Sequence, residues 1–410
     1  MEKKQRVQKF FFEYRIVREE TMSTIDWKQI MQWVVEQKHA GKDCGEKYTI
    51  VINDEYENKY GIRKEKSNIF MWHLSSEELN QEMLWSKEEN VNNRVVMQSW
   101  PKDAYVFGEY VDIWSIIKLL DYKHYILQRE IVVDIYFMKS TIYSQTSIRY
   151  ICSVKNILGY IIGWPLSFSR IKELNCLMGQ GIFAQQHVRE NGNFNFGKSS
   201  EIDILFEGRV AAVIAHEIAH IFEIQRANKL IGKRMTTIPI HLIDTPIQYD
   251  GWANKRWDDR GRLLSPISLL NAGICENTYN SAERSIYYKQ KVLKGMLNIE
   301  LSTESRYIKT REEMEELLLK GVRIEQCSGA HLAGHNIVLL SVEGRKSEKR
   351  RNYDHFFCKK MVLPVGQVLN RLSCVGRKRW LVNGRCSVNG PVSYAAPELL
   401  INGISAEFEY

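Results

Sequence analysis

The sequence predicts an α+β protein in which a central region with one long helix is flanked by an α+β amino-terminal region and a strand-rich carboxy-terminal region. Three observations carry this prediction: short β-branched and aromatic runs near the amino terminus, a long alanine- and isoleucine-rich segment after Gly208, and strand-like patterning from residue 336 onward. The 410 residues can bury more than one core. Changes in pattern place the expected regions at 1 to 145, 146 to 303 and 304 to 410.

The amino-terminal region combines expected strands and helices. Residues 48 to 54 and 132 to 137 are short runs of β-branched and aromatic residues, which are typical of strands. Residues 110 to 122 have a helical pattern. A further helix is expected after Thr24, whose side chain suits a helix cap and which is followed by apolar residues at helical spacing.

The central region predicts a hairpin followed by a helix. Asn191-Gly192 is a turn signal between two segments of alternating apolar character, so residues 180 to 206 predict a hairpin. The segment from 208 to 232 lacks proline, carries basic residues in its last turns and closes at Gly232, as helix ends prefer. We therefore expect one long apolar helix over that segment.

Two further helices are expected, over residues 276 to 296 and 310 to 320, before the strand-rich tail. The tail contains basic clusters at residues 344 to 351 and 376 to 380, and the whole chain has a net charge of +8. A basic balance favours anionic partners without identifying one. Nucleic acid, bound through these clusters, is therefore a candidate partner.

The cysteines and the amino terminus argue against several classes of protein. The eight cysteines form no C-x-x-C pair, which argues against a zinc ribbon and a thioredoxin-type redox site. The amino terminus lacks a secretory signal pattern. No stretch reaches the roughly 18 uninterrupted apolar residues that a spanning helix needs. We expect a cytoplasmic protein with no membrane span.

One segment, His216-Glu217-Ile218-Ala219-His220, has a pattern that predicts chemistry, because it matches H-E-x-x-H inside the expected helix. Residues four apart stand one above the other on a helix, so both imidazoles can converge on one zinc ion at about 2.0–2.1 Å. Glu217 then lies beside the metal and can deprotonate a bound water, as in peptide-bond hydrolysis. The sequence predicts His216 and His220 as zinc ligands and Glu217 as general base.

The motif and the segment before it resemble the zincin metallopeptidases and, within them, the SprT-like branch. The resemblance rests on AHEIAH at 215 to 220 and on residues 197 to 206, which look like the edge strand along a zincin cleft. It implies a zincin-like domain, over roughly residues 165 to 300, that binds zinc and cleaves a protein or peptide held as an extended strand. The SprT-like proteins that this segment resembles also have nucleic-acid-associated roles.

The sequence leaves the third zinc ligand open. Positions 223 and 226 are Glu and Arg, so the metzincin continuation H-E-x-x-H-x-x-G-x-x-H is absent. His241, the only histidine between residues 221 and 330, is the first choice. The alternatives are carboxylates, namely Glu276, Asp244 and Asp250. Glu223 is expected to orient an imidazole rather than to bind metal.

Two other interpretations stay open. Cys327, His331 and His335 have a spacing that could hold a structural zinc, with Cys358, Cys374 or Cys386 as the fourth ligand. A non-catalytic zincin-fold protein that binds nucleic acid through its basic carboxy-terminal region is the alternative function, because two ligands without a clear third allow a weakly bound metal. Neither a G-x-x-x-x-G-K-[ST] loop nor a G-x-S-x-G elbow occurs, so nucleotide hydrolysis and serine-hydrolase chemistry have no support.

Overall fold

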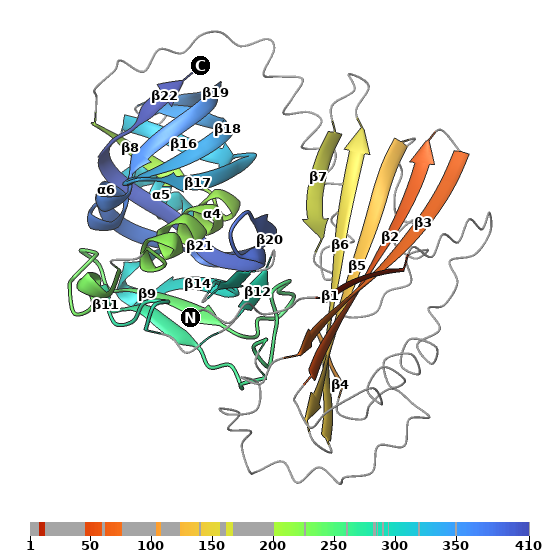
Figure 1. Cartoon of the computed structure of the whole chain (residues 1–410). Coiled ribbons are helices and arrows are strands. Elements are labelled where there is room, and N and C mark those ends of the chain that lie inside the picture. Colours follow the sequence, from red (N-terminus) through yellow and green to blue (C-terminus); the bar gives the residue numbers. More distant parts are fainter. Residues whose placement is uncertain are drawn as a thin grey trace. The chain divides into compact units, whose positions relative to one another are not determined.

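In a computed structural model, the chain forms two compact units (Figure 1). Unit 1 comprises Met1–Gly181, Tyr249–Leu264 and Ser285–Val292, and unit 2 comprises the remainder. The structure describes residues 8–12, 46–59, 62–75, 104–107, 124–138, 141–155, 161–166, 201–224, 227–259, 261–281, 284, 286–288, 291–293, 295–318, 320–348 and 351–409. The helices expected after Thr24 and over 110 to 122, and the turn at Asn191-Gly192, lie outside these residues. The division of the sequence at residues 145 and 303 stays a prediction.

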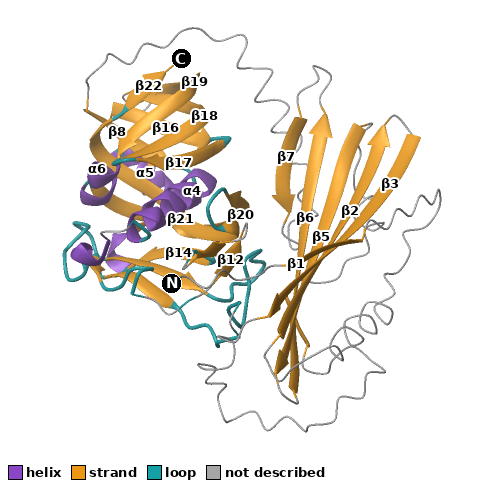
Figure 2. Cartoon of the chain, viewed as in Figure 1, coloured by secondary structure: helices purple, strands orange, loops and turns teal. Residues whose placement is uncertain are grey.

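Unit 1 is built on a sheet of long strands (Figure 2). Its path is β1 (Gln8–Phe12), β3 (Ile62–Ser75), β2 (Glu46–Lys59), β5 (His124–Met138), β6 (Thr141–Lys155) and β4 (Ala104–Phe107), and β7 (Ile161–Leu166) also pairs with β6. The β4–β6 pairing is parallel, and the other pairings are antiparallel. The runs at 48 to 54 and 132 to 137 lie in β2 and β5, so the strands expected there are confirmed.

A segment from later in the sequence, Tyr249–Leu264, packs against β6 within unit 1. Three hydrogen bonds hold its backbone carbonyls, from Gln145 Nε2 to Trp257 (3.2 Å), from Ser147 Oγ to Asn254 (3.2 Å) and from Arg149 Nε to Trp252 (2.9 Å). The donors are two residues apart along β6, and alternate residues of a strand share one face. One face of β6 therefore fixes the whole segment.

Unit 2 contains a mixed sheet of 13 described strands. Its main path is β11 (Ile274–Cys275), β10 (Ile267–Asn271), β9 (Ile240–Thr245), β14 (Asn298–Thr303), β21 (Gly390–Ser405), β8 (Glu201–Phe206), β16 (Lys320–Gln326), β18 (Asn336–Glu348), β19 (Arg351–Pro364) and β22 (Glu407–Glu409). Off this path, β17 (Gly329–Ala333) pairs with β18, β20 (Leu372–Cys386) with β21, and β15 (Ile308–Lys309) with β20. The expected strand-rich tail is confirmed by β18 to β22.

This strand order shows that the predicted fold class is wrong. The prediction was a central zincin-like domain in which residues 197 to 206 supply an edge strand beside the active-site helix. The described part of that segment is β8, which pairs with β21 on one side and with β16 on the other. Because strands pair with both of its edges, β8 is an interior strand of the sheet and not the open edge that a substrate strand would need.

Helix α4 (Gly208–Ala219) lies against β20 and β21, and it carries the H-E-x-x-H motif (Figure 1). Its alanines are fully buried, and such small side chains let a helix approach a sheet closely. The helix ends earlier than expected. Two 3-10 turns follow it, η3 (His220–Phe222) and η4 (Ala227–Leu230), in place of one helix to Gly232.

The other helices only partly match the sequence pattern. Helix α5 (Arg311–Leu317) lies in the expected segment and starts with a capping box between Thr310 and Glu313. Helix α6 (Val365–Asn370) has no counterpart in the sequence prediction. The helix expected over 276 to 296 is wrong, because the described residues there form loops and the hairpin of β12 (Ile286–Tyr288) and β13 (Lys291–Leu293). Within the described ranges, no helix combines the length and apolar character that a membrane span needs.

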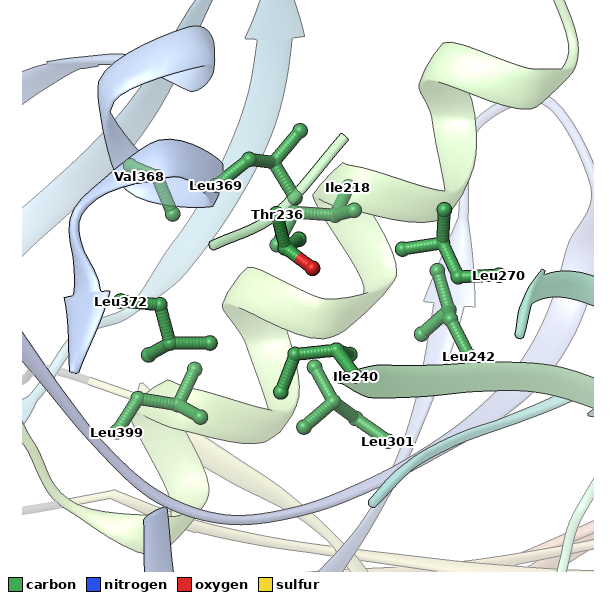
Figure 3. A pocket seen from close by; sticks show the side chains of 10 residues that line it. All are labelled: Ile218, Thr236, Ile240, Leu242, Leu270, Leu301, Val368, Leu369, Leu372 and Leu399. Carbon is green, nitrogen blue, oxygen red and sulfur yellow. The ribbon is translucent and has the colours of Figure 1, made fainter. Parts of the chain in front are cut away.

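A small apolar pocket lies against α4 (Figure 3). Ile218 of α4 lines it, together with leucines such as Leu242 of β9 and Leu399 of β21. Thr236 is the one polar side chain of the lining, and its hydroxyl donates to the Ile238 carbonyl at 2.6 Å. Ile218 lies two residues from both motif histidines, so on the helix it points away from them. The pocket therefore belongs to the core behind the motif.

Gly208 provides a test of how closely α4 approaches β20. A Cβ at this position would lie 1.6 Å from Trp380 Cδ1. We expect Gly208→Ala to lower the free energy of unfolding by about 1–3 kcal/mol, measured by urea denaturation, because the added carbon displaces the indole or the helix. The control is Gly366→Ala in α6, where an added Cβ meets nothing within 4 Å. For Gly366→Ala we expect the free energy of unfolding to rise by about 0.5–1 kcal/mol. Equal losses of stability in the two variants would contradict the close approach of α4 to β20.

Candidate metal centre

Three donor side chains converge at the carboxyl end of α4. His216 lies in the helix, His220 follows it at the start of η3, and Cys386 is the last residue of β20. Their donor atoms all lie within 4.8 Å of one another. The two Nε2 atoms are 3.2 Å apart, and Cys386 Sγ lies 3.6 Å from His220 Nε2. Because β20 pairs with β21, and α4 lies against both strands, the hairpin brings the thiol to the histidines.

His216 is buried in a way that favours its neutral form. Burial, and then the neighbouring His220, hold the pKa of His216 well below its usual value. The imidazole stacks on the ring of Tyr394, with centroids 4.9 Å apart and an interplanar angle of 28°. Its Nδ1 has no hydrogen-bond partner among the described residues. A neutral imidazole offers a lone pair, which is the form that binds metals.

His220 is oriented by Glu223, as the sequence predicts for that glutamate. The Nδ1 of His220 donates to Glu223 Oε2 at 2.6 Å, which assigns a proton to Nδ1 and leaves Nε2 facing the other donors. Asn389 Nδ2 donates to Oε1 of the same carboxylate at 2.8 Å. Burial lowers the pKa of His220, but hydrogen bonds to Cys386 and Glu223 outweigh burial and raise it to about 10.

Cys386 has the surroundings of a thiolate. Burial raises the pKa of its thiol, but the hydrogen bond with His220, the charge of His220 and the backbone amides of Asn389 and Val388 together outweigh burial, and the net pKa is below the usual value. The backbone amide of Val388 also donates to Sγ, at 3.4 Å. Thiolate is the form of cysteine that binds metals. Histidine nitrogen and cysteine sulfur are donors that zinc prefers, and three protein ligands leave one position of a four-coordinate zinc open.

Glu217 lies beside these donors and has few partners of its own. Its side chain is buried, and its Oε1 lies 4.0 Å from His216 Nε2. Burial raises the pKa of Glu217 to about 7, although His220 and the backbone amide of Leu332 act in the opposite direction. Its Oε2 has no hydrogen-bond partner among the described residues. A carboxyl group with a pKa in this range can accept and release a proton near neutral pH.

The other candidate ligands lie elsewhere. His241, the first choice for the third position, lies on β9, where its Nδ1 accepts a hydrogen bond from the Ala272 amide at 3.5 Å. Glu276 is exposed just after β11, and Asp250 belongs to unit 1. Neither these residues nor His241 is in the converging donor group, where Cys386 stands instead.

The structural zinc site considered for Cys327, His331 and His335 does not form among the described residues. His331 and His335 are exposed, whereas Cys327 is partly buried against the core. Among the described His, Cys, Asp and Glu side chains, His216, His220 and Cys386 form a group that could hold a metal, and Cys327, His331 and His335 belong to no such group. The glycines between them belong to strand β17 and its turn, so the spacing does not bring the side chains to one point.

Asp244 is a structural residue whose oxygens are already bonded. It is fully buried and accepts hydrogen bonds from Tyr279 Oη and Arg284 Nη1, both at 2.8 Å. The backbone amides of Leu297 and Asn298 add bonds at 3.1 Å and 3.2 Å. Burial raises the pKa of Asp244, and Arg284 and Tyr279 oppose that rise. The carboxylate joins β9 to β14 and to the segment around Tyr279, which explains why the periodicity over 276 to 296 does not produce a helix.

Comparison with known proteins identifies the fold. No protein-family model matches the chain, and no curated protein matches its sequence. Among solved structures, TldE from Thermococcus kodakarensis matches with a TM-score of 0.57 and 11% sequence identity, covering 93% of this chain and 100% of that chain. The fold is that of TldE.

Two further solved structures match this chain. Both are proposed modulators of DNA gyrase. The protein from Thermotoga maritima matches with a TM-score of 0.56 and 10% identity over 94% of this chain and 100% of that chain. The protein from Bacteroides thetaiotaomicron matches with a TM-score of 0.52 and 11% identity over 93% and 100%. At these identities the likeness shows the fold alone.

The TldE fold overturns the family expected from the motif. The chain is neither a zincin nor a SprT-like protein, and the zincin fold and the nucleic-acid-binding zincin scaffold that the resemblance implied are both wrong. H-E-x-x-H is five residues of one helix and does not specify the sheet on which that helix lies. The sequence offers Cys386 only as a possible further ligand of the Cys327 site, because its 166-residue separation from His220 leaves no spacing signal that joins it to the motif histidines. The one local sign is the hairpin turn pair Asn389-Gly390 that follows it.

Replacing the buried Asp244 tests its structural role. We expect Asp244→Asn to lower the free energy of unfolding by about 3–5 kcal/mol, measured by urea denaturation, because Arg284 is left buried without its counter-charge. Glu304→Gln is the matched control, since Glu304 and Arg306 are an exposed pair with 45% and 69% of their side chains accessible. Such pairs contribute about 0–1 kcal/mol. Similar losses for both variants would show that the buried Asp244–Arg284 pair stabilises the fold no more than the exposed Glu304–Arg306 pair does.

Proposed function

We propose that this chain is a metal-dependent peptidase with the TldE fold. In this proposal His216, His220 and Cys386 hold one zinc ion, and Glu217 is the residue that accepts and releases a proton. The observation that carries the proposal is the convergence of three donor atoms within 4.8 Å beside a buried carboxyl group. The proposal uses the chemistry of these residues and does not use the zincin fold.

The residues of the site fit a metal better than they fit a purely structural cluster. His216 Nδ1 and Glu217 Oε2 are buried with no hydrogen-bond partner among the described residues, although polar atoms in a core normally have one. The equally buried Asp244, in contrast, is fully bonded. A site that leaves polar atoms without partners at considerable cost is typical of functional residues.

The zinc ion would supply positive charge that polarises a substrate carbonyl and lowers the pKa of coordinated water. The side chains of the chain do the remaining work. Glu217 takes up a proton and delivers it to the leaving amine. Glu223 holds the ring of His220 through Nδ1, and Tyr394 holds the ring of His216 by stacking.

Strand β17 supports a peptide as the substrate. Among the described strands it pairs only with β18, so no described strand covers its other edge. The amide of Leu332 in β17 faces the Glu217 carboxyl, which places the strand beside the site. An extended peptide can add to such an edge through main-chain hydrogen bonds. In this proposal β17 has the role that the sequence analysis gave to residues 197 to 206.

The ligand set can be tested by metal analysis. We expect the purified chain to bind about one zinc ion, and Cys386→Ala to weaken binding by at least about 100-fold, beyond the 10- to 100-fold loss typical when a residue that only orients a ligand is replaced. Competition with a chromophoric chelator measures both affinities. His241→Ala is the control and should bind zinc like the unmodified chain. Equal losses in the two variants would contradict the proposed third ligand.

The role of Glu217 can be tested separately from metal binding. We expect Glu217→Gln to keep its zinc and to lose about 100-fold or more in kcat on an unstructured peptide substrate, because general acid and base catalysis contributes about that much. Glu276→Gln, which replaces an exposed carboxyl, is the control. If Glu217→Gln retains full activity, Glu217 is not the proton acceptor.

The same atoms favour one second candidate function, a thiol hydrolase. Cys386 Sγ, His220 Nε2 and Nδ1, and Glu223 Oε2 follow the order of nucleophile, base and orienting acid, with separations of 3.6 Å and 2.6 Å. Complete zinc removal distinguishes the two functions. Peptidase activity that survives chelation and is then abolished by iodoacetamide supports the thiol hydrolase, whereas activity that is lost on chelation and restored by zinc supports the metal-dependent enzyme.

A further inference from the structure

Asn389 is a buried amide in an otherwise exposed turn. It lies between β20 and β21, and only 4% of it is accessible, whereas Ser387 and Val388 directly before it are exposed. Buried amides require partners for their donors and acceptors. The turn is therefore held inward by contacts of this one side chain.

The Asn389 side chain contacts both sides of the donor cluster. Its Nδ2 donates to Glu223 Oε1 at 2.8 Å and lies 3.8 Å from Cys386 Sγ. Glu223 in turn accepts from His220 Nδ1, and His220 Nε2 faces Cys386 Sγ. The four side chains form a closed ring in which each touches the next. Asn389 is the member that contacts both Glu223, which orients His220, and Cys386.

Gly295 provides the space for this amide. A Cβ at position 295 would lie 2.1 Å from Asn389 Oδ1 and 2.9 Å from its Cγ. Gly295 lies just before β14, and its own carbonyl accepts a hydrogen bond from Arg284. Any larger residue at position 295 would push the amide out of place without changing its chemistry. The backbone is thus arranged around the position that Asn389 occupies.

We propose that Asn389 is a positioning residue that sets the affinity and the coordination geometry of the metal centre by holding His220, through Glu223, and Cys386 in one arrangement. This inference rests on the metal centre of the proposed function. The two N–H groups of one amide can serve the carboxylate and the sulfur at once. Residues that orient metal ligands in this way typically change metal affinity by about 10- to 100-fold when they are replaced.

The test measures zinc affinity of the full chain by chelator competition, together with the thiolate-to-metal charge-transfer band after cobalt(II) substitution. Asn389→Leu keeps the size of the side chain and removes both N–H groups. Gly295→Ala displaces the amide and leaves it intact. Val388→Ala is the control, because that side chain is 51% exposed in the same turn.

We expect Asn389→Leu and Gly295→Ala to bind zinc about 10- to 100-fold more weakly. Their cobalt band should shift, which a purely structural role would not cause, and Val388→Ala should be unchanged. If Asn389→Leu does not fold, the zinc affinity and the cobalt band of Gly295→Ala test the inference in its place. Unchanged affinity in the folded variants, or an equal loss in Val388→Ala, overturns the inference. An unmodified chain that binds no zinc overturns the metal centre itself.

Discussion

The close packing of α4 on β20 and β21 is the constraint on which the candidate site depends. The helix meets these strands with small side chains, since Ala211, Ala215 and their neighbours are fully buried, and Gly208 leaves room for Trp380 at its first turn. A bulkier helix would stand further from the sheet. At the present separation, the histidines at the end of the helix and the cysteine at the end of β20 reach one point.

The buried carboxylate Asp244 and the two buried motif residues of unit 2 differ in how their polar atoms are bonded. Asp244 is surrounded by a tyrosine, an arginine and backbone amides, and every contact joins pieces of the sheet. His216 and Glu217 are buried to a similar degree, yet each retains an atom without a partner among the described residues. Burial without compensation is costly, and the two site residues carry that cost whereas Asp244 does not. Thr245 Oγ1 and Asn298 Oδ1 are also buried with no partner among the described residues, so the site is identified by its converging donor atoms as well.

Local features of the fold followed from the sequence, and the arrangement of those features did not. The strand at β8, the start of α4 at Gly208 and the capped helix α5 each depend on residues a few positions apart, and each was predictable. The expected helix over 276 to 296 failed because Tyr279 is drawn into the buried contacts of Asp244, which local periodicity does not reveal. The zincin assignment failed for a related reason, since a five-residue motif contains no information about strand order.

By itself, the sequence determined that His216 and His220 stand together, because a spacing of four residues is resolved within one turn of helix. It also determined that Glu217 lies next to them. Only the tertiary structure decided that Cys386 completes the group, that β8 is enclosed, and that β17, which lies beside Glu217, pairs on one side only among the described strands. Those features depend on which strands pair. Strand pairing, with the helix packed on the paired strands, brings together His220 and Cys386 across 166 positions, and no local pattern specifies it.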